Sequence, residues 1–140
     1  MREITGGIFT DSRGTIKHVN DFTFQGVERF YTIYHPNTEV IRAWQGHRVE
    51  TKWFYVIQGS FKLQWIKIDD WDSSGKNLIP ESLILTAQES KLIKIGPGYA
   101  NGIKALEPDS IIMLFSDKSV EESKKDDYRW GVDYFVRAEW

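Results

Sequence analysis

Residues 41–60 constrain the fold most, because they contain two strand-like segments separated by polar residues and ended by a turn. Nearly every residue from 52 to 57 is aromatic or β-branched, which favours a strand over a helix. Gln58, Gly59 and Ser60 supply turn-forming residues, and alternation of apolar and polar residues resumes from 61 to 65. This stretch is therefore predicted to form a β-hairpin.

Short segments of similar character recur along the chain, with turn formers at intervals of about 8 to 12 residues. Strands are predicted at residues 7–10, 15–19, 27–34, 40–44, 63–69, 81–86, 91–95 and 109–115. The segment 27–34 is apolar on both faces towards its end, which predicts a central strand. One short helix is predicted from Ser119, because Ser119 and Glu122 have the spacing of a capping box. The pattern indicates an all-β jelly roll.

Length and composition limit the classes of function. The 140 residues fit one domain, 1–140, and a net charge of −2 with a pI of about 5.9 gives no basic excess for binding nucleic acid. An anionic ligand would need a local basic pocket. The absence of cysteine excludes disulfides and fits a cytoplasmic protein. With no apolar N-terminal segment and no apolar run of 18 residues, we expect no membrane partner.

Two motifs of the cupin barrels are matched in spacing. In the first motif, two histidines two residues apart precede a glutamate and then a glycine, and here Gln45, His47, Lys52 and Gly59 stand at these positions. Residues 96–102 resemble the second motif, with Asn101 at its histidine position. The resemblance implies the cupin form of the jelly roll, a double-stranded β-helix. Because a lysine ammonium repels a cation, we expect neither a metal nor another cofactor.

Lysine at the glutamate position occurs in one branch of the cupins, and the chain resembles that branch over about residues 8–135. The branch contains the dTDP-4-dehydrorhamnose 3,5-epimerases and the dTDP-sugar 3,4-ketoisomerases, whose motif begins with Arg as residues 42–45 do here. The resemblance implies a metal-free isomerase, an epimerase or 3,4-ketoisomerase acting on a 4-keto-6-deoxy sugar nucleotide in surface-polysaccharide sugar biosynthesis. It also implies a homodimer.

The chain departs from this family at residues that carry the chemistry. Gln45 and Asn101 replace histidines, Met113 stands at the position of a tyrosine acid, and Gly131 stands where an acidic residue follows the tail tryptophan. An amide forms hydrogen bonds to a sugar but does not exchange protons near pH 7. The alternative is therefore a catalytically degenerate cupin that binds a sugar or nucleotide sugar without turnover.

The resemblance implies a set of site residues. His47 is the predicted proton carrier, since Ala43, Gln45 and His47 alternate on one strand face and His47 alone of them titrates near neutrality. The residues predicted to bind substrate are Arg42, Gln45, Lys52, Trp44, Tyr31, Tyr99 and Asn101.

Ordinary structural roles stay open for these residues. The alternative for His47 is an exposed loop position, for Lys52 a surface position and for Arg42 a structural role. The aromatic residues Trp44, Tyr31 and Tyr99 also fit an apolar core. The remaining histidines, His18 and His35, are predicted to lie on the surface.

Overall fold

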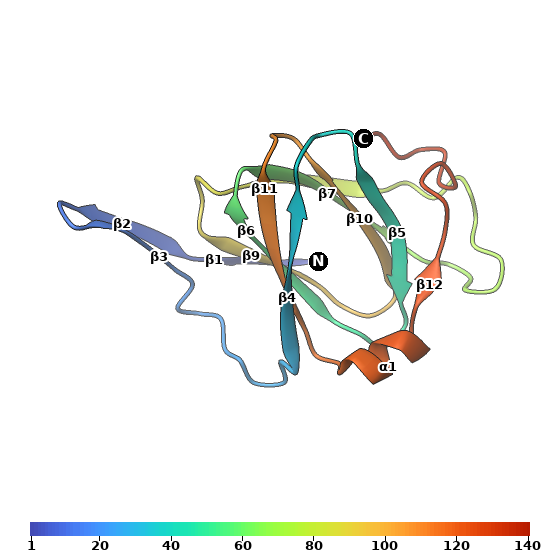
Figure 1. Ribbon diagram of the computed structural model, residues 1–140. Coiled ribbons are helices and arrows are strands. Elements are labelled where there is room, and N and C mark those ends of the chain that lie inside the picture. The colour runs from blue at the N-terminus through green and yellow to red at the C-terminus, as the bar shows by residue number, and fades with distance from the viewer.

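Two five-stranded antiparallel sheets face each other in the computed structural model, which describes residues 1–140 (Figure 1). In the first sheet the order is β1 (Arg2–Thr5), β9 (Lys91–Ile95), β6 (Lys52–Gln58), β11 (Ser110–Ser116) and β4 (Arg29–His35). In the second it is β12 (Tyr128–Arg129), β5 (Ile41–His47), β10 (Tyr99–Ala105), β7 (Ser60–Lys67) and β8 (Glu81–Thr86). The predicted all-β jelly roll is confirmed.

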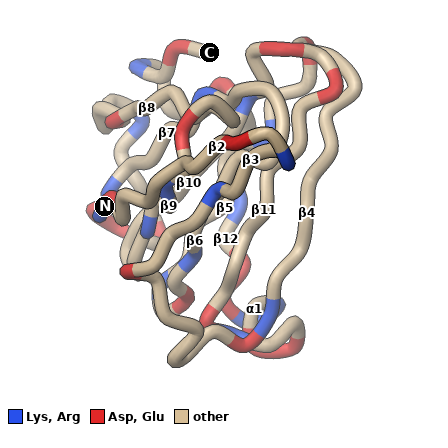
Figure 2. The backbone as a smooth tube through the Cα atoms, turned by 90° about the vertical axis from the view of Figure 1, so that its left-hand side faces the viewer, with Lys and Arg blue, Asp and Glu red and all other residues tan.

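Two elements lie outside the facing sheets. A hairpin of β2 (Gly7–Asp11) and β3 (Gly14–His18) projects away from the barrel, and the short helix α1 (Val120–Lys125) lies at the end of the barrel below β5 (Figure 1). Acidic and basic residues are interspersed along the backbone (Figure 2). No helix has the length and apolar character needed to cross a membrane.

The main core lies between the two sheets and follows from strand alternation. On β6 the inward side chains include Phe54 and Val56, which are 1% and 3% exposed, and β7, β9, β10 and β11 contribute aliphatic and aromatic partners. Burying each such side chain contributes roughly 1.5–3 kcal/mol. Polar residues continue the inward rows beyond this core, so the barrel is packed in one part and lined by polar groups in another.

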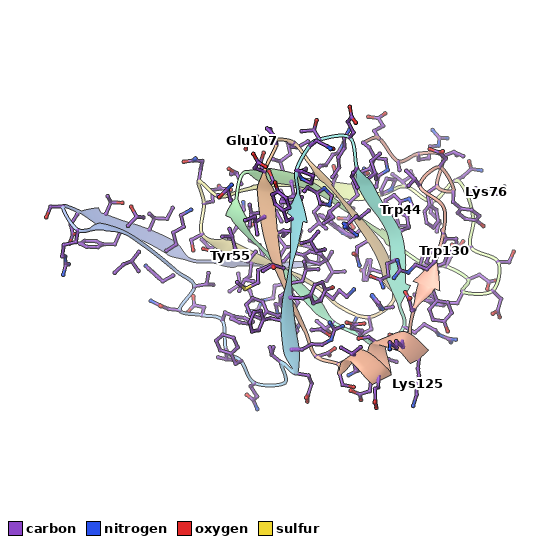
Figure 3. The ribbon with its side chains drawn as sticks, in the orientation of Figure 1. Trp44, Tyr55, Lys76, Glu107, Lys125 and Trp130 are labelled. Atoms are coloured by element: carbon purple, nitrogen blue, oxygen red, sulfur yellow. The ribbon has the colours of Figure 1, made fainter.

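A second core covers the outer side of β5. Trp44 and Phe135 are each 1% exposed and meet edge to face, with ring centroids 5.4 Å apart. The indole of Trp44 donates a hydrogen bond to the carbonyl of Val132, and the backbones of Trp44 and Trp130 exchange two hydrogen bonds. Figure 3 shows Trp44 and Trp130 on this side of the molecule. The C-terminal segment is thereby fixed along β5.

Several local predictions agree with the structure. The hairpin around residues 11–14 is present, β8 and β9 have the predicted bounds, and α1 begins after Ser119 with both hydrogen bonds of a capping box to Glu122. At Gly59, φ is +70°, and a Cβ atom there would lie 2.1 Å from the Ser110 hydroxyl. The predicted turn is present and needs glycine for both its backbone angle and its space. The predicted β-hairpin across it was wrong, because β6 pairs with β9 and β11 in the first sheet whereas β7 pairs with β8 and β10 in the second.

Other local predictions were wrong. The strand β4 is at the edge of its sheet instead of its centre, and its outward side chains Phe30 and Tyr34 are 66% and 54% exposed. An apolar pattern on both faces does not reveal whether the outer face is covered. The strands β1, β10 and β12 were not predicted, β10 because its glycine-rich start resembled a turn. His35 is 1% exposed instead of superficial, because its ring packs against Phe61.

Candidate active site in the barrel

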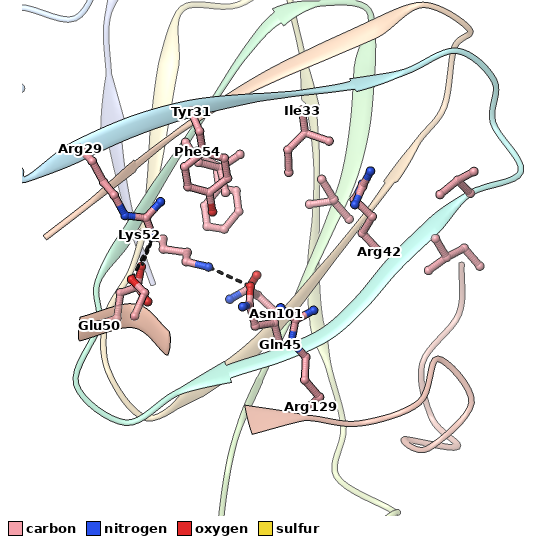
Figure 4. Close-up of a pocket in the computed structure, with 15 residues that line it drawn as sticks. Arg29, Tyr31, Ile33, Arg42, Gln45, Glu50, Lys52, Phe54, Asn101 and Arg129 are labelled. Atoms are coloured by element: carbon pink, nitrogen blue, oxygen red, sulfur yellow. Dashed lines mark hydrogen bonds and ion pairs between the residues drawn. The ribbon is translucent and has the colours of Figure 1, made fainter. Parts of the chain in front are cut away.

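A cavity of about 620 Å³ opens into the barrel where the apolar core ends. This volume lies within the usual range for small-ligand sites, roughly 300–1,000 Å³. Its wall combines aliphatic, aromatic and charged groups from both sheets and from α1 (Figure 4). The lining residues are Arg29, Tyr31, Ile33, Val40, Ile41, Arg42, Gln45, Glu50, Lys52, Phe54, Asn101, Ile103, Leu114, Ser123 and Arg129.

The cavity is positively charged although the chain is not. Among its lining residues are three arginines and a lysine, against one carboxylate, that of Glu50. The whole chain has a net charge of −2. Basic groups concentrated in a concave, partly desolvated site attract anions more strongly than the same groups spread over a surface. The local basic pocket that an anionic ligand requires is present.

A β-bulge in β5 brings Arg42 and Gln45 into the cavity together. Gln45 pairs with Asn101 on β10, whereas Arg42 pairs with Ile103, so two residues of β5 oppose one of β10. That residue is Gly102, where a Cβ atom would lie 2.5 Å from the Cβ of Ala43. The extra residue breaks the two-residue alternation of the strand. As a result, Ala43 and Trp44 pack on the outer core while Arg42 and Gln45 line the cavity.

Lys52 is a buried amine that faces this cavity. Lys52 is 4% exposed, and its Nζ donates a hydrogen bond of 2.9 Å to Oε1 of Gln45 (Figure 4). Burial lowers the pKa of Lys52 to about 8, since desolvation disfavours the ammonium form, and the charges of Arg29 and Arg129 act in the same direction. The carboxylates of Glu50 and Asp127 oppose this shift. Lys52 therefore titrates near pH 8, well below an ordinary lysine.

Gln45 connects Lys52 to the C-terminal segment. Its amide donates a 2.8 Å hydrogen bond to Oδ1 of Asp127, which also accepts one of 2.7 Å from Nε of Arg129. Pairing of Arg129 with Gln45 between β12 and β5 produces this contact. Burial would raise the pKa of Asp127, but the hydrogen bonds from Arg129 and Gln45 outweigh it and lower the pKa. We call Lys52, Gln45, Asp127 and Arg129 the cavity network.

The two arginines from β4 and β5 are held in different ways. Arg29 donates to the carbonyl of Lys118, to the hydroxyl of Ser123 at 2.9 Å and to Glu50 at 3.4 Å, so its position is fixed. Arg42 donates through Nε to Nε2 of His35 at 3.0 Å. Only the neutral ring of His35 can accept this bond, and burial lowers the pKa of His35, as does the charge of Arg42. The Nη groups of Arg42 remain available to a ligand.

Tyr31 adds a hydroxyl donor to the cavity wall. Its pKa is raised to about 12, because burial disfavours the phenolate more than the nearby charge of Arg29 favours it. The guanidinium of Arg29 lies 5.0 Å from the centre of the ring. The phenol is therefore protonated at neutral pH and can donate a hydrogen bond to an oxygen of a bound molecule.

A second cluster of ionisable groups lies nearby but is closed. Nδ1 of His47 lies 2.7 Å from the Asp126 carbonyl oxygen and 3.1 Å from Oε2 of Glu50, and the Ser116 hydroxyl donates to Glu50 Oε1 at 2.6 Å. The carboxylate of Asp126 accepts three hydrogen bonds from the backbone N–H groups of residues 48–50. We call His47, Glu50, Ser116 and Asp126 the buried network.

The state of His47 follows from these partners. A carbonyl oxygen only accepts, so Nδ1 carries the proton and Nε2 carries the lone pair. Burial lowers the pKa of His47, and the charge of Lys52 lowers it further against the opposing effects of Glu50 and Asp126. The ring is therefore neutral at neutral pH. His47, Glu50 and Asp126 lie close enough to suggest metal binding, but Nδ1 and the Asp126 carboxylate are already engaged with the backbone.

The structure brings together five of the eight predicted site residues. Arg42, Gln45, Lys52, Tyr31 and Asn101 all line the cavity. The prediction that His47 faces the cavity was wrong, because its ring is 2% exposed and belongs to the buried network. The prediction that Trp44 and Tyr99 form cavity walls was also wrong. Trp44 directly precedes the cavity residue Gln45 on β5 and so faces the outer core, and Tyr99 packs against the main core.

Sequence reasoning missed four residues of this region: Arg29, Glu50, Asp127 and Arg129. Arg29 alternates with Tyr31 on β4, and Glu50 lies two residues before Lys52, so local spacing could have included both. Asp127 and Arg129 are more than 80 residues from Gln45. Only the pairing of β12 with β5 brings them to it.

Comparison with known proteins gives structural matches only. No family model matches the chain, and no curated protein matches it. An epimerase of Mycobacterium tuberculosis superposes with a TM-score of 0.79 at 19% identity over 99% of this chain and 72% of its own. For dTDP-4-dehydrorhamnose 3,5-epimerase from Sulfolobus tokodaii the TM-score is 0.77 at 22% identity, over 99% of this chain and 79% of the epimerase. The 3,4-ketoisomerase QdtA from Thermoanaerobacterium thermosaccharolyticum, in complex with TDP, superposes with a TM-score of 0.72 at 18% identity, over 98% of this chain and 93% of its own.

These matches, together with the two facing sheets and the cavity between them, define the class of fold as a cupin. It is the cupin fold that dTDP-4-dehydrorhamnose 3,5-epimerases and sugar 3,4-ketoisomerases have in common.

Proposed function

We propose that the protein isomerises a nucleotide-linked 4-keto-6-deoxy sugar in the barrel cavity, as an epimerase or 3,4-ketoisomerase. The observation that carries the proposal is Lys52, a buried amine with a pKa of about 8 that faces a cavity containing three arginines. Proteins of the same fold support the substrate class. A variant of QdtA has been solved in complex with TDP-4-keto-6-deoxyglucose, and a 3,5-epimerase of Bacillus anthracis with TDP and PPi.

The arginines account for binding of the anionic part of such a substrate. Guanidinium groups match the geometry of phosphate oxygens, and several of them around one cavity favour a diphosphate. Arg42 and Arg129 are each held through Nε, which leaves their Nη groups for the ligand. The aliphatic and aromatic wall, which includes Phe54 and Leu114, would contact the apolar faces of the sugar.

Lys52 and Tyr31 account for the chemistry. Isomerisation beside a ketone requires a base that removes the α-proton and a donor that stabilises the enolate oxygen. With a pKa of about 8, roughly a tenth of Lys52 is the neutral amine at pH 7. That amine takes the proton from the carbon beside the ketone. In a 3,4-ketoisomerase the ammonium then returns a proton to the former ketone carbon, while the hydroxyl proton of the first carbon passes to the former ketone oxygen. In an epimerase a proton from solvent returns to the first carbon on its opposite face. Tyr31, protonated with a pKa of about 12, donates to the enolate oxygen.

Deuterium exchange tests this proposal. The protein is incubated with dTDP-4-keto-6-deoxyglucose in deuterated water, and deuterium beside the ketone is followed by NMR. We expect incorporation by the wild type, a loss of at least about 10²-fold in Lys52→Met, and full activity in the control Lys67→Met, which changes an exposed lysine on β7. Ligand binding without exchange in the wild type would contradict the proposal and support a binding protein.

A homodimer is part of the proposal, supported by exposed apolar surface. The outer face of β4 exposes Phe30, and the projecting β2–β3 hairpin exposes Phe9 and Ile16 at 54% and 60%. A two-stranded hairpin has little stability alone in water, so a covering surface is expected. Light scattering should give twice the chain mass, reduced to one chain mass in Phe9→Lys/Phe30→Lys. We also propose a cytoplasmic location, which the lack of cysteine fits.

A further inference from the structure

Gln45 occupies an unusual position between two charged groups. Its Nε2 donates to Asp127 at 2.8 Å, and its Oε1 accepts from Lys52 at 2.9 Å. Both contacts involve the same amide, so rotating it by half a turn would exchange donor and acceptor on both sides. The orientation of this amide decides which of its atoms Lys52 meets.

The two neighbours require the same orientation. An ionised aspartate only accepts hydrogen bonds, and an ammonium only donates them, so the NH₂ group must face Asp127 and the carbonyl must face Lys52. Asp127 is kept ionised, because the hydrogen bonds from Arg129 and Gln45 hold its pKa below the ordinary value despite burial. Nε of Arg129 also donates a 2.7 Å hydrogen bond to Oδ1 of Asp127, which restrains the carboxylate.

We infer that Gln45 is a positioning residue, locked by Asp127 so that its carbonyl oxygen fixes the amine of Lys52 at the cavity wall. This inference rests on the proposed function for its catalytic meaning. The neutral amine has two N–H groups and one lone pair. With one N–H engaged by Gln45, the lone pair is left for the cavity, where a substrate carbon would lie. A fixed lone pair is what an efficient base needs.

Several charges face Lys52 and must be separated from the effect of the amide. Arg29 lies on β4, Glu50 and His47 precede β6, and Asp127 and Arg129 lie on the segment that pairs with β5. Asp127 therefore acts on Lys52 in two ways, through its charge and through the amide of Gln45. Replacing Asp127 alone does not distinguish them, but replacing it in the presence and absence of the amide does.

The experiment is an NMR titration of Lys52 in protein with ¹³C-labelled lysine, with the Lys52 signal assigned from Lys52→Arg. Four proteins form a cycle: the wild type, Asp127→Asn, Gln45→Leu and the double variant. Gln45→Met replaces Gln45→Leu if the latter does not fold. Asp133→Asn removes the same charge from the exposed C-terminal segment and serves as the control. The titration needs no substrate, so it stands even if no isomerase activity is found.

We expect Asp127→Asn to lower the Lys52 midpoint by about one pH unit more in the wild type than in the Gln45→Leu background, because only the former loses the locked amide. Asp133→Asn should leave the midpoint unchanged. In active protein the pH profile of deuterium exchange should move with the midpoint. Equal shifts in both backgrounds would show that Asp127 acts through charge alone and would overturn the inference, as would a wild-type midpoint unaffected by Asp127→Asn.

Discussion

The cavity network and the buried network both contain a residue of β5 and differ in what their ionisable groups contact. Asp126 and Asp127 are neighbours in the chain, yet Asp126 accepts three backbone N–H groups inside the protein, whereas Asp127 faces Gln45 beside the cavity. His47 and Lys52 are both buried, but the hydrogen of Nδ1 is held by a carbonyl oxygen while Nζ lies in the cavity wall. In the buried network the backbone engages Nδ1 of His47 and the carboxylate of Asp126, although Nε2 of His47 has no partner, and such fixed contacts stabilise the fold. Burial facing an open cavity leaves a group able to react.

The largest expected effect is on stability, and it separates the two aspartates. Asp126→Ala leaves three backbone N–H groups of residues 48–50, of which that of Glu50 is buried, without their acceptor and should lower the free energy of unfolding by about 3–5 kcal/mol. Asp127→Ala is the matched control, and as a more exposed group it should lower that free energy by less than about 1 kcal/mol. Urea denaturation measures both. Equal losses would show that the distinction between the networks is wrong.

The next effect is the contribution of Lys52 to the free energy of unfolding of the protein as a function of pH. Its pKa is about 8 in the folded protein against 10.5 ordinarily, so the unfolded chain binds more protons between these values and stability rises with pH there. Lys52→Met should therefore be more stable than the wild type at pH 7, by roughly 2–3 kcal/mol. The difference should shrink above pH 8 and vanish near 10.5. A pH-independent difference in urea unfolding would mean that the amine is not desolvated.

A smaller effect is expected on ligand binding. Arg42→Gln and Arg129→Gln each remove an exposed cation from the cavity and should weaken dTDP binding by about tenfold, measured by calorimetry. Because neither residue is part of an apolar core, unfolding should change little. His47→Gln, in the buried network, is the contrasting variant and should leave dTDP affinity unchanged. Loss of affinity in His47→Gln but not in the arginine variants would place the ligand elsewhere.

Sequence reasoning succeeded where local patterns decide the structure. Alternation from Lys52 to Val56 correctly placed Lys52 and Phe54 inside the barrel, and the capping spacing of Ser119 and Glu122 located the start of α1. These features depend on residues within a few positions of each other. Their geometry is therefore readable without the tertiary structure.

It failed where distant contacts decide. One extra residue opposite Gly102 changed the alternation of β5 before Gln45, which put Arg42 in the cavity in place of Ala43. A bulge is a property of two paired strands and leaves no period in one of them. The contact of Asp127 with Gln45 likewise needs β12, a strand of two residues without a sequence signal of its own.

In the proposed reaction Lys52, and not His47, carries the proton, and the pH dependence of deuterium exchange tests this directly. Exchange into dTDP-4-keto-6-deoxyglucose should rise with pH through a midpoint near 8, the pKa at which Lys52 becomes the neutral amine. The profile of His47→Gln should keep that midpoint, because the ring lies outside the cavity. A wild-type midpoint between about 6 and 7 that disappears in His47→Gln would contradict the account, since an imidazole titrates in that range.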